Sequence, residues 1–242
     1  MTATNDDFAG GEAMPDGPVR MPETSAVLTP LVSHATRREA VAARLRLEIV
    51  SGRIAPGTLL RETAIADQLG VSATPVREAF GELASEGLLQ IEAHRLKRVT
   101  PIDFAATEDL IQVQTRLWRL GYEWGMPNVG SEGMERLDAA IAAYRFALEQ
   151  NDPFGAISAA HEFHTVFIAA SANRELLRST LDRRALIARF ILLHGASSIS
   201  EAGLRQHVEM LSCFRRGDTD GVLSRLDELA ARLLAMAQAP KN

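Results

Sequence analysis

Residues Leu69–Phe80 read LGVSATPVREAF, a stretch in which one helix ends and another begins after a tight turn. Gly70 can take the backbone conformation that ends a helix. Ser72 or Thr74 can cap the next helix, and Pro75 fits its first turn, where a missing N–H costs nothing. The stretch therefore predicts two short helices joined by a tight turn.

The sequence on either side of this turn predicts another helix before it and a β-hairpin after it. Upstream, TRREAVAARLRLEIVSG starts with a Thr cap, repeats apolar residues four apart and stops at Gly52. Downstream, residues 88–91 and 98–100 are predicted strands joined by a basic tip. Helix, helix, turn, helix and wing is the order of a winged helix-turn-helix domain. We predict this domain over residues 36–101.

In a winged helix-turn-helix domain the third helix enters the major groove, so its exposed residues are candidates for DNA contact. Arg77 lies in the N-terminal half of that helix, and we predict that it contacts a base or a phosphate. The alternative is that Arg77 is an ordinary exposed arginine without a DNA contact. For the basic residues of the wing, the alternative is a loop that only contacts water. The predicted DNA contacts are Arg61, Ser72, Ala73, Thr74, Pro75, Arg77, His94, Arg95 and Lys97. Residues 36–101 carry ten basic and eight acidic side chains, a net charge of +2 that supports DNA binding only weakly.

The length and composition of the whole chain limit the class of protein that it can be. Its 242 residues are 46% hydrophobic and 5% aromatic, with a formal net charge of −5. The single Cys213 excludes an intrachain disulfide and a Cys-based zinc finger. No apolar run approaches the roughly 18 residues that span a bilayer, and the N-terminus lacks the pattern of a signal peptide. We therefore expect a cytoplasmic, nucleoid-associated protein with no membrane partner.

The regions outside the winged domain differ sharply in pattern. Residues 1–35 mix Gly, Pro and acidic residues without apolar periodicity, and predict a disordered tail. Residues 102–242 carry apolar stripes at helical spacing, separated by Gly, Pro, Asn and Asp clusters. The stripes are Leu110, Val113, Leu117, Leu120 and Trp124; Leu137, Ile141, Tyr144 and Leu148; and Val222, Leu226, Leu229 and Leu233. We predict a mainly α fold, in which the winged helix-turn-helix is followed by an antiparallel all-α helical bundle.

Three histidines carry the chemistry that the predicted bundle offers. His161 and His164 lie three apart on one helix face, and His207 lies on an apolar stripe, so all three are predicted to point inward. The motif HEFH is one residue shorter than H-E-x-x-H, which excludes the zinc-protease pattern. No complete set of nucleophile, base and open metal position accompanies these histidines, so an enzyme is the weakest of the functions considered.

The run GRIAPGTLLRETAIADQLGVSATPVREAFGELASEGLL, residues 52–89, resembles the DNA-binding domain of the GntR family of bacterial transcription regulators. The order and length of the predicted bundle are similar to the FCD domain, which in this family senses a small molecule and forms the dimer. Ala73 stands where the family has a base-reading Arg, and Leu96 stands near its wing Gly. The resemblance implies a dimeric regulator with an altered operator preference, since one bidentate Arg contact contributes roughly 1–3 kcal/mol of base discrimination.

The resemblance also implies a metal site in the bundle. FCD domains bind a divalent metal through D-x-x-x-H on one helix and one His on each of two later helices. His164 and His207 match two of these ligands, whereas Ala160 and Leu229 stand in place of the Asp and the last His. We therefore expect no cofactor. A divalent metal at His164 and His207, with His161 as a third imidazole, is the open alternative.

One arginine and the three histidines form the predicted effector site. Arg116 matches the family's arginine that meets an acidic effector or the metal site, and the alternative is an arginine that extends to water. The predicted effector-binding residues are Arg116, His161, His164 and His207. The favoured function is a transcription repressor that binds double-stranded operator DNA as a homodimer under the control of a small-molecule effector, with a carboxylate as one candidate. An effector-independent DNA-binding protein is the alternative, and a metal-dependent enzyme the third.

Overall fold

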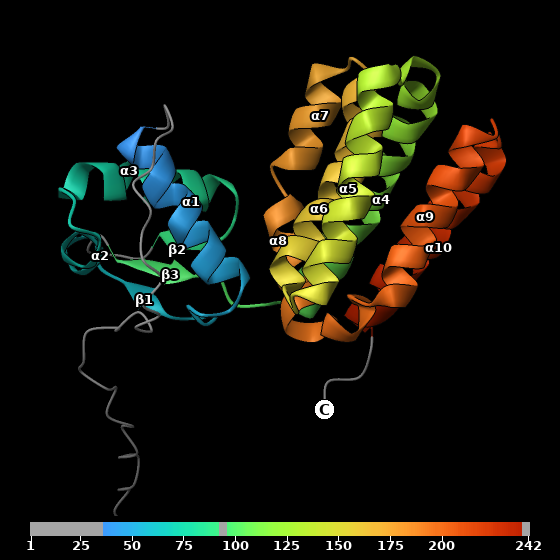
Figure 1. The fold of residues 1–242 in the computed structure, drawn as a ribbon. Coiled ribbons are helices and arrows are strands. Elements are labelled where there is room, and N and C mark those ends of the chain that lie inside the picture. The colour runs from blue at the N-terminus through green and yellow to red at the C-terminus, as the bar shows by residue number, and fades with distance from the viewer. Residues whose placement is uncertain (1–35, 92–95, 239–242) are drawn as a thin grey trace, which may run out of the picture.

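The computed structural model describes residues 36–91 and 96–238, which form an N-terminal unit with a small sheet and a larger all-helical unit (Figure 1). The predicted tail, residues 1–35, and the wing residues His94 and Arg95 lie outside the described residues. No helix in the described ranges is long and apolar enough to span a membrane. The mainly α fold class is confirmed.

The N-terminal unit has the predicted winged helix-turn-helix order. Its elements are α1 (Arg37–Val50), β1 (Leu59–Leu60), α2 (Glu62–Leu69), α3 (Ala73–Ser85), β2 (Leu89–Ile91) and β3 (Lys97–Val99). The antiparallel strands lie in the order β1, β3, β2, with Leu60 opposite Lys97 and Gln90 opposite Arg98. Strand β1 was not predicted, because a strand of two residues is too short to show alternation.

Local signals in the sequence set the helix ends. Helix α1 begins with a capping box, in which the Thr36 hydroxyl accepts from the backbone N–H of Glu39 and the Glu39 carboxylate accepts from that of Thr36. Helix α2 ends at Gly70, whose φ of 64° is the left-handed conformation that glycine favours. Ser72 occupies the N-cap position of α3, but its side chain makes no capping hydrogen bond. The predicted side-chain cap by Ser72 or Thr74 is therefore wrong.

The core of the N-terminal unit lies between α1, α3 and the sheet. Its largest fully buried side chains are Leu45, Ile49, Leu60, Phe80, Leu83 and Leu88. An ion-pair network also crosses from α1 to α3. Arg46 donates through Nη2 to Oε1 of Glu82 at 2.8 Å and through Nε to Oε2 of Glu86 at 2.8 Å. Apolar packing and this network together hold α3, the predicted DNA-reading helix, against α1.

The C-terminal unit is an all-α bundle, as predicted, with seven α-helices in the described residues. They are α4 (Phe104–Gly125), α5 (Ser131–Glu149), α6 (Pro153–Ala170), α7 (Arg174–Leu181), α8 (Arg184–His194), α9 (Glu201–Arg215) and α10 (Thr219–Gln238), with short 3₁₀ turns η2 (Met126–Asn128) and η3 (Ala196–Ser198). The predicted stripes on α5 and α10 face inward, since Leu137, Tyr144, Val222 and Leu226 are buried. Helix α4 packs against both α6 and α10.

Helix α4 has two apolar faces, and the one that was predicted to face the core is the wrong one. The face that is buried in the bundle consists of Ile111, Trp118 and Tyr122. Most of the predicted stripe faces outward instead: Val113, Leu120 and Trp124 are 59%, 36% and 47% exposed. Both faces repeat at helical spacing, so periodicity alone cannot decide which of them the bundle covers. We refer to Val113, Leu120 and Trp124 as the α4 stripe.

Helix α8 packs on the N-terminal unit, which the chain itself joins to the bundle between β3 and α4. It lies against α1, and its Ala185 and Ala188 belong to the apolar core of the N-terminal unit. Arg189 is 2% exposed and donates from Nη2 to the carbonyl oxygen of Thr100, between the two units, at 2.6 Å. Burial lowers the pKa of Arg189 to about 10.

Gly125 permits the close packing of α4 against α6. A Cβ at this position would overlap with the carbonyl oxygen of Phe167 on α6. We expect Gly125→Ala to lower the free energy of unfolding by roughly 1–3 kcal/mol in urea denaturation, because the two helices must move apart. Gly81→Ala is the matched control, because a Cβ in that helical position meets nothing within 4 Å. Equal effects of the two substitutions would contradict this role of Gly125.

Candidate DNA-reading surface and ligand cavity

Arg77 is the central residue of the predicted DNA-reading surface. It lies near the start of α3 with 58% of its side chain exposed, and its Nε donates to Oε2 of Glu62 at 3.0 Å. Glu62 begins α2 and has only 11% of its side chain exposed. The carboxylate thus orients the guanidinium at the outer face of α3 and offsets part of its charge in the free protein.

The other described DNA-contact candidates lie around Arg77 and on the wing. Arg61, Ser72 and Thr74 are exposed, whereas Ala73, Pro75 and Lys97 are half-buried. Ala73 offers only a methyl group, which can pack on a base but cannot donate a hydrogen bond to it. Lys97 lies on β3, and its neighbour Arg98 donates from Nη1 to the carbonyl oxygen of Gly57 at 3.0 Å. Arg98 therefore has a structural role beside β1.

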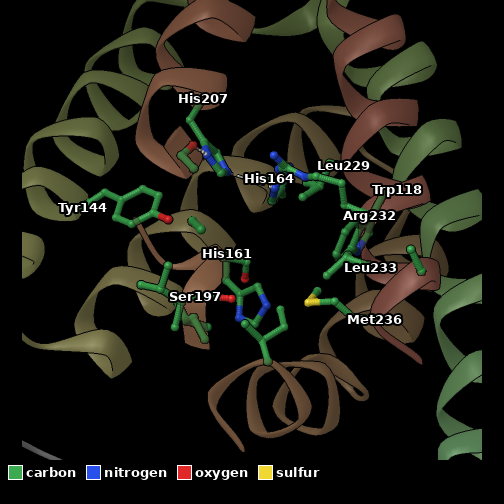
Figure 2. A pocket seen from close by; sticks show the side chains of 17 residues that line it. Trp118, Tyr144, His161, His164, Ser197, His207, Leu229, Arg232, Leu233 and Met236 are labelled. Carbon is green, nitrogen blue, oxygen red and sulfur yellow. Dashed lines mark hydrogen bonds between the residues drawn. The ribbon is translucent and has the colours of Figure 1, made fainter. Parts of the chain in front are cut away.

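A cavity of about 330 Å³ lies inside the bundle (Figure 2). It is bounded by α4, α5, α6, α8, η3, α9 and α10. Its polar lining is Tyr144, His161, His164, Ser197, Ser198, His207 and Arg232. Its larger apolar side chains are Trp118, Ile157, Ile191, Ile199, Leu229, Leu233 and Met236. The cavity brings together the three predicted histidines, two from α6 and one from α9.

Two of these histidines belong to a chain of buried hydrogen bonds. The Tyr122 hydroxyl lies 2.7 Å from Nδ1 of His164, and the Nε2 atoms of His164 and His207 are 3.4 Å apart. Nδ1 of His207 lies 2.8 Å from the carbonyl oxygen of Gly203, which can only accept, so this nitrogen carries the proton. Nε2 of His207 then accepts from Nε2–H of His164, whose Nδ1 accepts from Tyr122. One tautomer of each ring thus satisfies the whole chain.

Burial keeps all three imidazoles uncharged near neutral pH. It lowers the pKa of His164 well below the ordinary 6.5, and it also lowers the pKa of His207, where the charge of Arg232 adds to the effect. Burial and the charge of Arg184 lower the pKa of His161 to about 4. Within the described residues no hydrogen bond joins the ring of His161. It is therefore the histidine that remains open to a ligand.

The residues around His164 and His207 do not fit the divalent metal that the family resemblance implies. Ala160 and Leu229 also line the cavity and have no lone pairs to offer. Within residues 36–91 and 96–238 no three His, Cys, Asp or Glu side chains lie close enough together to hold a metal ion, so His161 does not complete the set. The facing nitrogens of His164 and His207 are occupied by each other.

Arg116 does not line the cavity, contrary to the prediction. It is exposed on α4, between Val113 and Leu120, on the face that the sequence analysis took for the inner one. Arg232 on α10 brings a guanidinium to the cavity instead. It follows Leu229 by three residues and shares its helix face, a spacing that could have indicated it from the sequence.

Comparison with known proteins gives the class of this chain. The profile of the gntR family of bacterial regulatory proteins matches residues 37–95, and the profile of the FCD domain matches residues 109–232. The chain belongs to the GntR family, in the group with a C-terminal FCD domain. It is a DNA-binding transcription regulator and not an enzyme, as its relatives are transcription regulators.

Individual relatives agree with this class. The "Probable D-xylose utilization operon transcriptional repressor" of Paenarthrobacter nicotinovorans is 32% identical over 146 residues, which cover 59% of this chain and 64%, less than two thirds, of that protein. The HTH-type transcriptional repressor RspR of Escherichia coli K12 is 28% identical over 184 residues, 74% of this chain and 78% of the relative. The solved structure of E. coli McbR/YncC has a TM-score of 0.73 at 19% identity, covers 84% of this chain and 98% of its own, and supports the fold alone.

With His164 and His207 as the only matching metal ligands among the described residues of the cavity, we predict that the protein binds little metal. Purified without a metal-chelating tag, it should contain far less than one equivalent of zinc, nickel or manganese, and EDTA should leave its melting temperature unchanged, because two imidazoles without further ligands do not hold a divalent ion tightly. Elemental analysis and thermal unfolding measure both quantities. One equivalent of metal that disappears in His164→Ala or His207→Ala, but not in the exposed control His194→Ala, would show that the site binds metal after all.

Proposed function

We propose that this protein is a repressor that binds operator DNA as a homodimer, and that a small molecule in the bundle cavity controls its affinity for the operator. A carboxylate is one candidate for that molecule. The observation that carries the proposal is the position of α8, which forms a wall of the cavity and also packs on the DNA-binding domain. A change in the cavity wall can reach the DNA-binding domain through this helix.

The contacts of α8 on its two sides support this coupling. Ile191 lines the cavity, while Ala188, three residues earlier, is buried in the core of the N-terminal unit. Leu193 packs closely on Gly52, just beyond the end of α1, where a Cβ would overlap with it. A ligand that displaces Ile191 therefore has to shift α8 against α1 or strain one of the two contacts. Such a shift would change how the DNA-binding domains are presented to an operator.

Operator reading is proposed to use the exposed face of α3. Arg77 is the one cation among the candidates on that helix, and its pair with Glu62 is exposed enough to open when DNA arrives. Ser72 and Thr74 offer hydroxyls at the exposed start of the helix, a position that suits phosphate contact. Lys97 on the wing adds a cation for the DNA backbone.

The α4 stripe is the proposed contact between the two copies of the homodimer. Its three side chains form one line along an exposed helix face, and exposed apolar patches of this kind mark protein interfaces. A two-fold pair of such helices would bury each stripe against its copy. The two α3 helices would then face the two halves of a roughly palindromic operator.

The names of the relatives support repression as the outcome of binding. Both relatives described above are named transcriptional repressors, and one of them is named for a D-xylose utilization operon. The cavity favours ligand control over the effector-independent alternative, because its volume is one that small ligands occupy and the ring of His161 has no hydrogen bond within the described residues.

Substitution of Arg77 tests the reading surface. After an operator has been selected from a random DNA pool, we expect Arg77→Ala to weaken its binding by about 1–3 kcal/mol, because a base or phosphate contact is lost. Gel-shift titration at fixed salt measures this, and Arg145→Ala, an exposed arginine on α5, is the control. Lys97→Ala should weaken all sequences equally and reduce the salt slope by about one. Unchanged operator affinity in Arg77→Ala would refute the assignment.

Substitution in the α4 stripe tests the dimer. We expect Leu120→Glu to shift the chain from the mass of two copies to that of one in light scattering, because a carboxylate would be buried in an apolar contact. Phe146→Glu on α5 is the control, since Phe146 is 63% exposed and lies outside the stripe. A Leu120→Glu protein that stays dimeric would place the interface elsewhere.

A further inference from the structure

The walls of the bundle cavity show which kind of ligand it can take. Most of its large side chains are apolar, and Ala160 and Leu229 add apolar surface at the two positions where the family resemblance implies metal ligands. Trp118 stacks on His164 at 5.1 Å between ring centres, with 7° between the ring planes, which gives the cavity a flat aromatic wall. An apolar ligand body of small-molecule size fits such a space.

Three polar side chains of the cavity already have hydrogen-bond partners within the protein. His164 and His207 use both ring nitrogens in the chain from Tyr122 to Gly203, and the Ser198 hydroxyl donates to the carbonyl oxygen of Gly195 at 2.7 Å. A sugar or sugar acid would bring several hydroxyls into this space. Each hydroxyl left unpaired would weaken binding about tenfold or more.

Among the described residues that line the cavity, the one charged side chain is a cation. No Asp or Glu is among the residues that line it, whereas Arg232 does line it. The Arg232 guanidinium donates to Oε1 of Gln206, an uncharged acceptor, and no described carboxylate pairs with it. Its field reaches the cavity, because it lowers the pKa of His207, after the larger effect of burial. A guanidinium that lacks a carboxylate partner can bind a carboxylate through two parallel hydrogen bonds.

We propose that the cavity binds an apolar monocarboxylate with an aromatic or branched aliphatic body, without a metal ion, and that Arg232 pairs with the carboxylate. The apolar body lies against Trp118 and the α10 side chains, and His161 offers a further hydrogen bond. This inference rests on the proposed function only in treating the cavity as the effector site. It assigns specificity to Arg232 on α10 rather than to Arg116 or to a metal.

Calorimetric titration of the full chain in EDTA tests the ligand class. The probes are benzoate, phenylacetate, 3-phenylpropionate and 4-methylpentanoate, with the carboxamide of each acid, D-gluconate and D-xylose for comparison. We expect at least one acid to bind about tenfold or more tightly than its carboxamide and than either sugar compound, because only the acid pairs with a guanidinium while leaving no hydroxyl unpaired. Failure of all four acids, tighter binding of D-gluconate, or binding that EDTA abolishes would overturn the inference.

Substitution of Arg232 tests the anchor. Arg232→Gln should weaken the bound acid about tenfold or more, leave its carboxamide unaffected, and keep the melting temperature of the ligand-free protein. Arg225→Gln on the same helix is the matched control, because Arg225 pairs with Glu209 at 2.9 Å and does not line the cavity. Full affinity of the acid for Arg232→Gln would refute the anchor.

Operator binding separates this inference from the proposed function. If one of the acids binds as expected but operator affinity does not change, ligand control of DNA binding is contradicted. The assignment of the ligand as an apolar monocarboxylate would still hold. Release of the operator by D-gluconate or D-xylose, with no binding of the four acids, would support ligand control and overturn the ligand class.

Discussion

The burial of α8 between the bundle cavity and the DNA-binding domain is the constraint on which the arrangement of the two units depends. One side of the helix completes the cavity through Ile191, and the other enters the N-terminal core through Ala185 and Ala188. Arg189 is buried at the same place, and its only described hydrogen bond is to the carbonyl oxygen of Thr100, while its Nε has no partner within the described residues. A buried cation with so few partners is stable only while the surrounding packing stays intact, so a movement of α8 in one unit affects the packing in the other.

A chain of buried hydrogen bonds holds the two imidazoles at the positions where the family resemblance implies metal ligands. The chain from Tyr122 through His164 and His207 to Gly203 fixes both rings and leaves them uncharged. Loss of ligands at Ala160 and Leu229 therefore does not leave the remaining imidazoles unsatisfied. In the proposed complex it is Arg232, exposed at the edge of the cavity, that pairs with the charge of the ligand.

Local signals explain how much of this molecule the sequence could predict. The winged domain followed from Gly70, the Thr36 cap and Pro75, because turns and helix ends are encoded within a few residues. The inner face of α4 did not follow, because two apolar faces compete on that helix and only its neighbours decide between them. Tyr122 was missed because it meets His164 only through the packing of α4 against α6. Arg232, in contrast, could have been indicated by its spacing from Leu229 on α10.

The ion pair between Arg77 and Glu62 has a consequence for how the protein searches a chromosome. Between operators the principal cation of α3 is already occupied by a carboxylate of its own chain. DNA has to displace that carboxylate before Arg77 can contact it. Replacing the ion pair with Glu62 by one with a phosphate brings little gain, and this holds at any DNA sequence. Only a base edge that accepts two hydrogen bonds from the guanidinium gives a clear advantage over Glu62. In the proposed mode of DNA reading, Glu62 would compete with DNA for Arg77, shorten the time that the protein spends bound to unrelated sequences and thereby favour the operator.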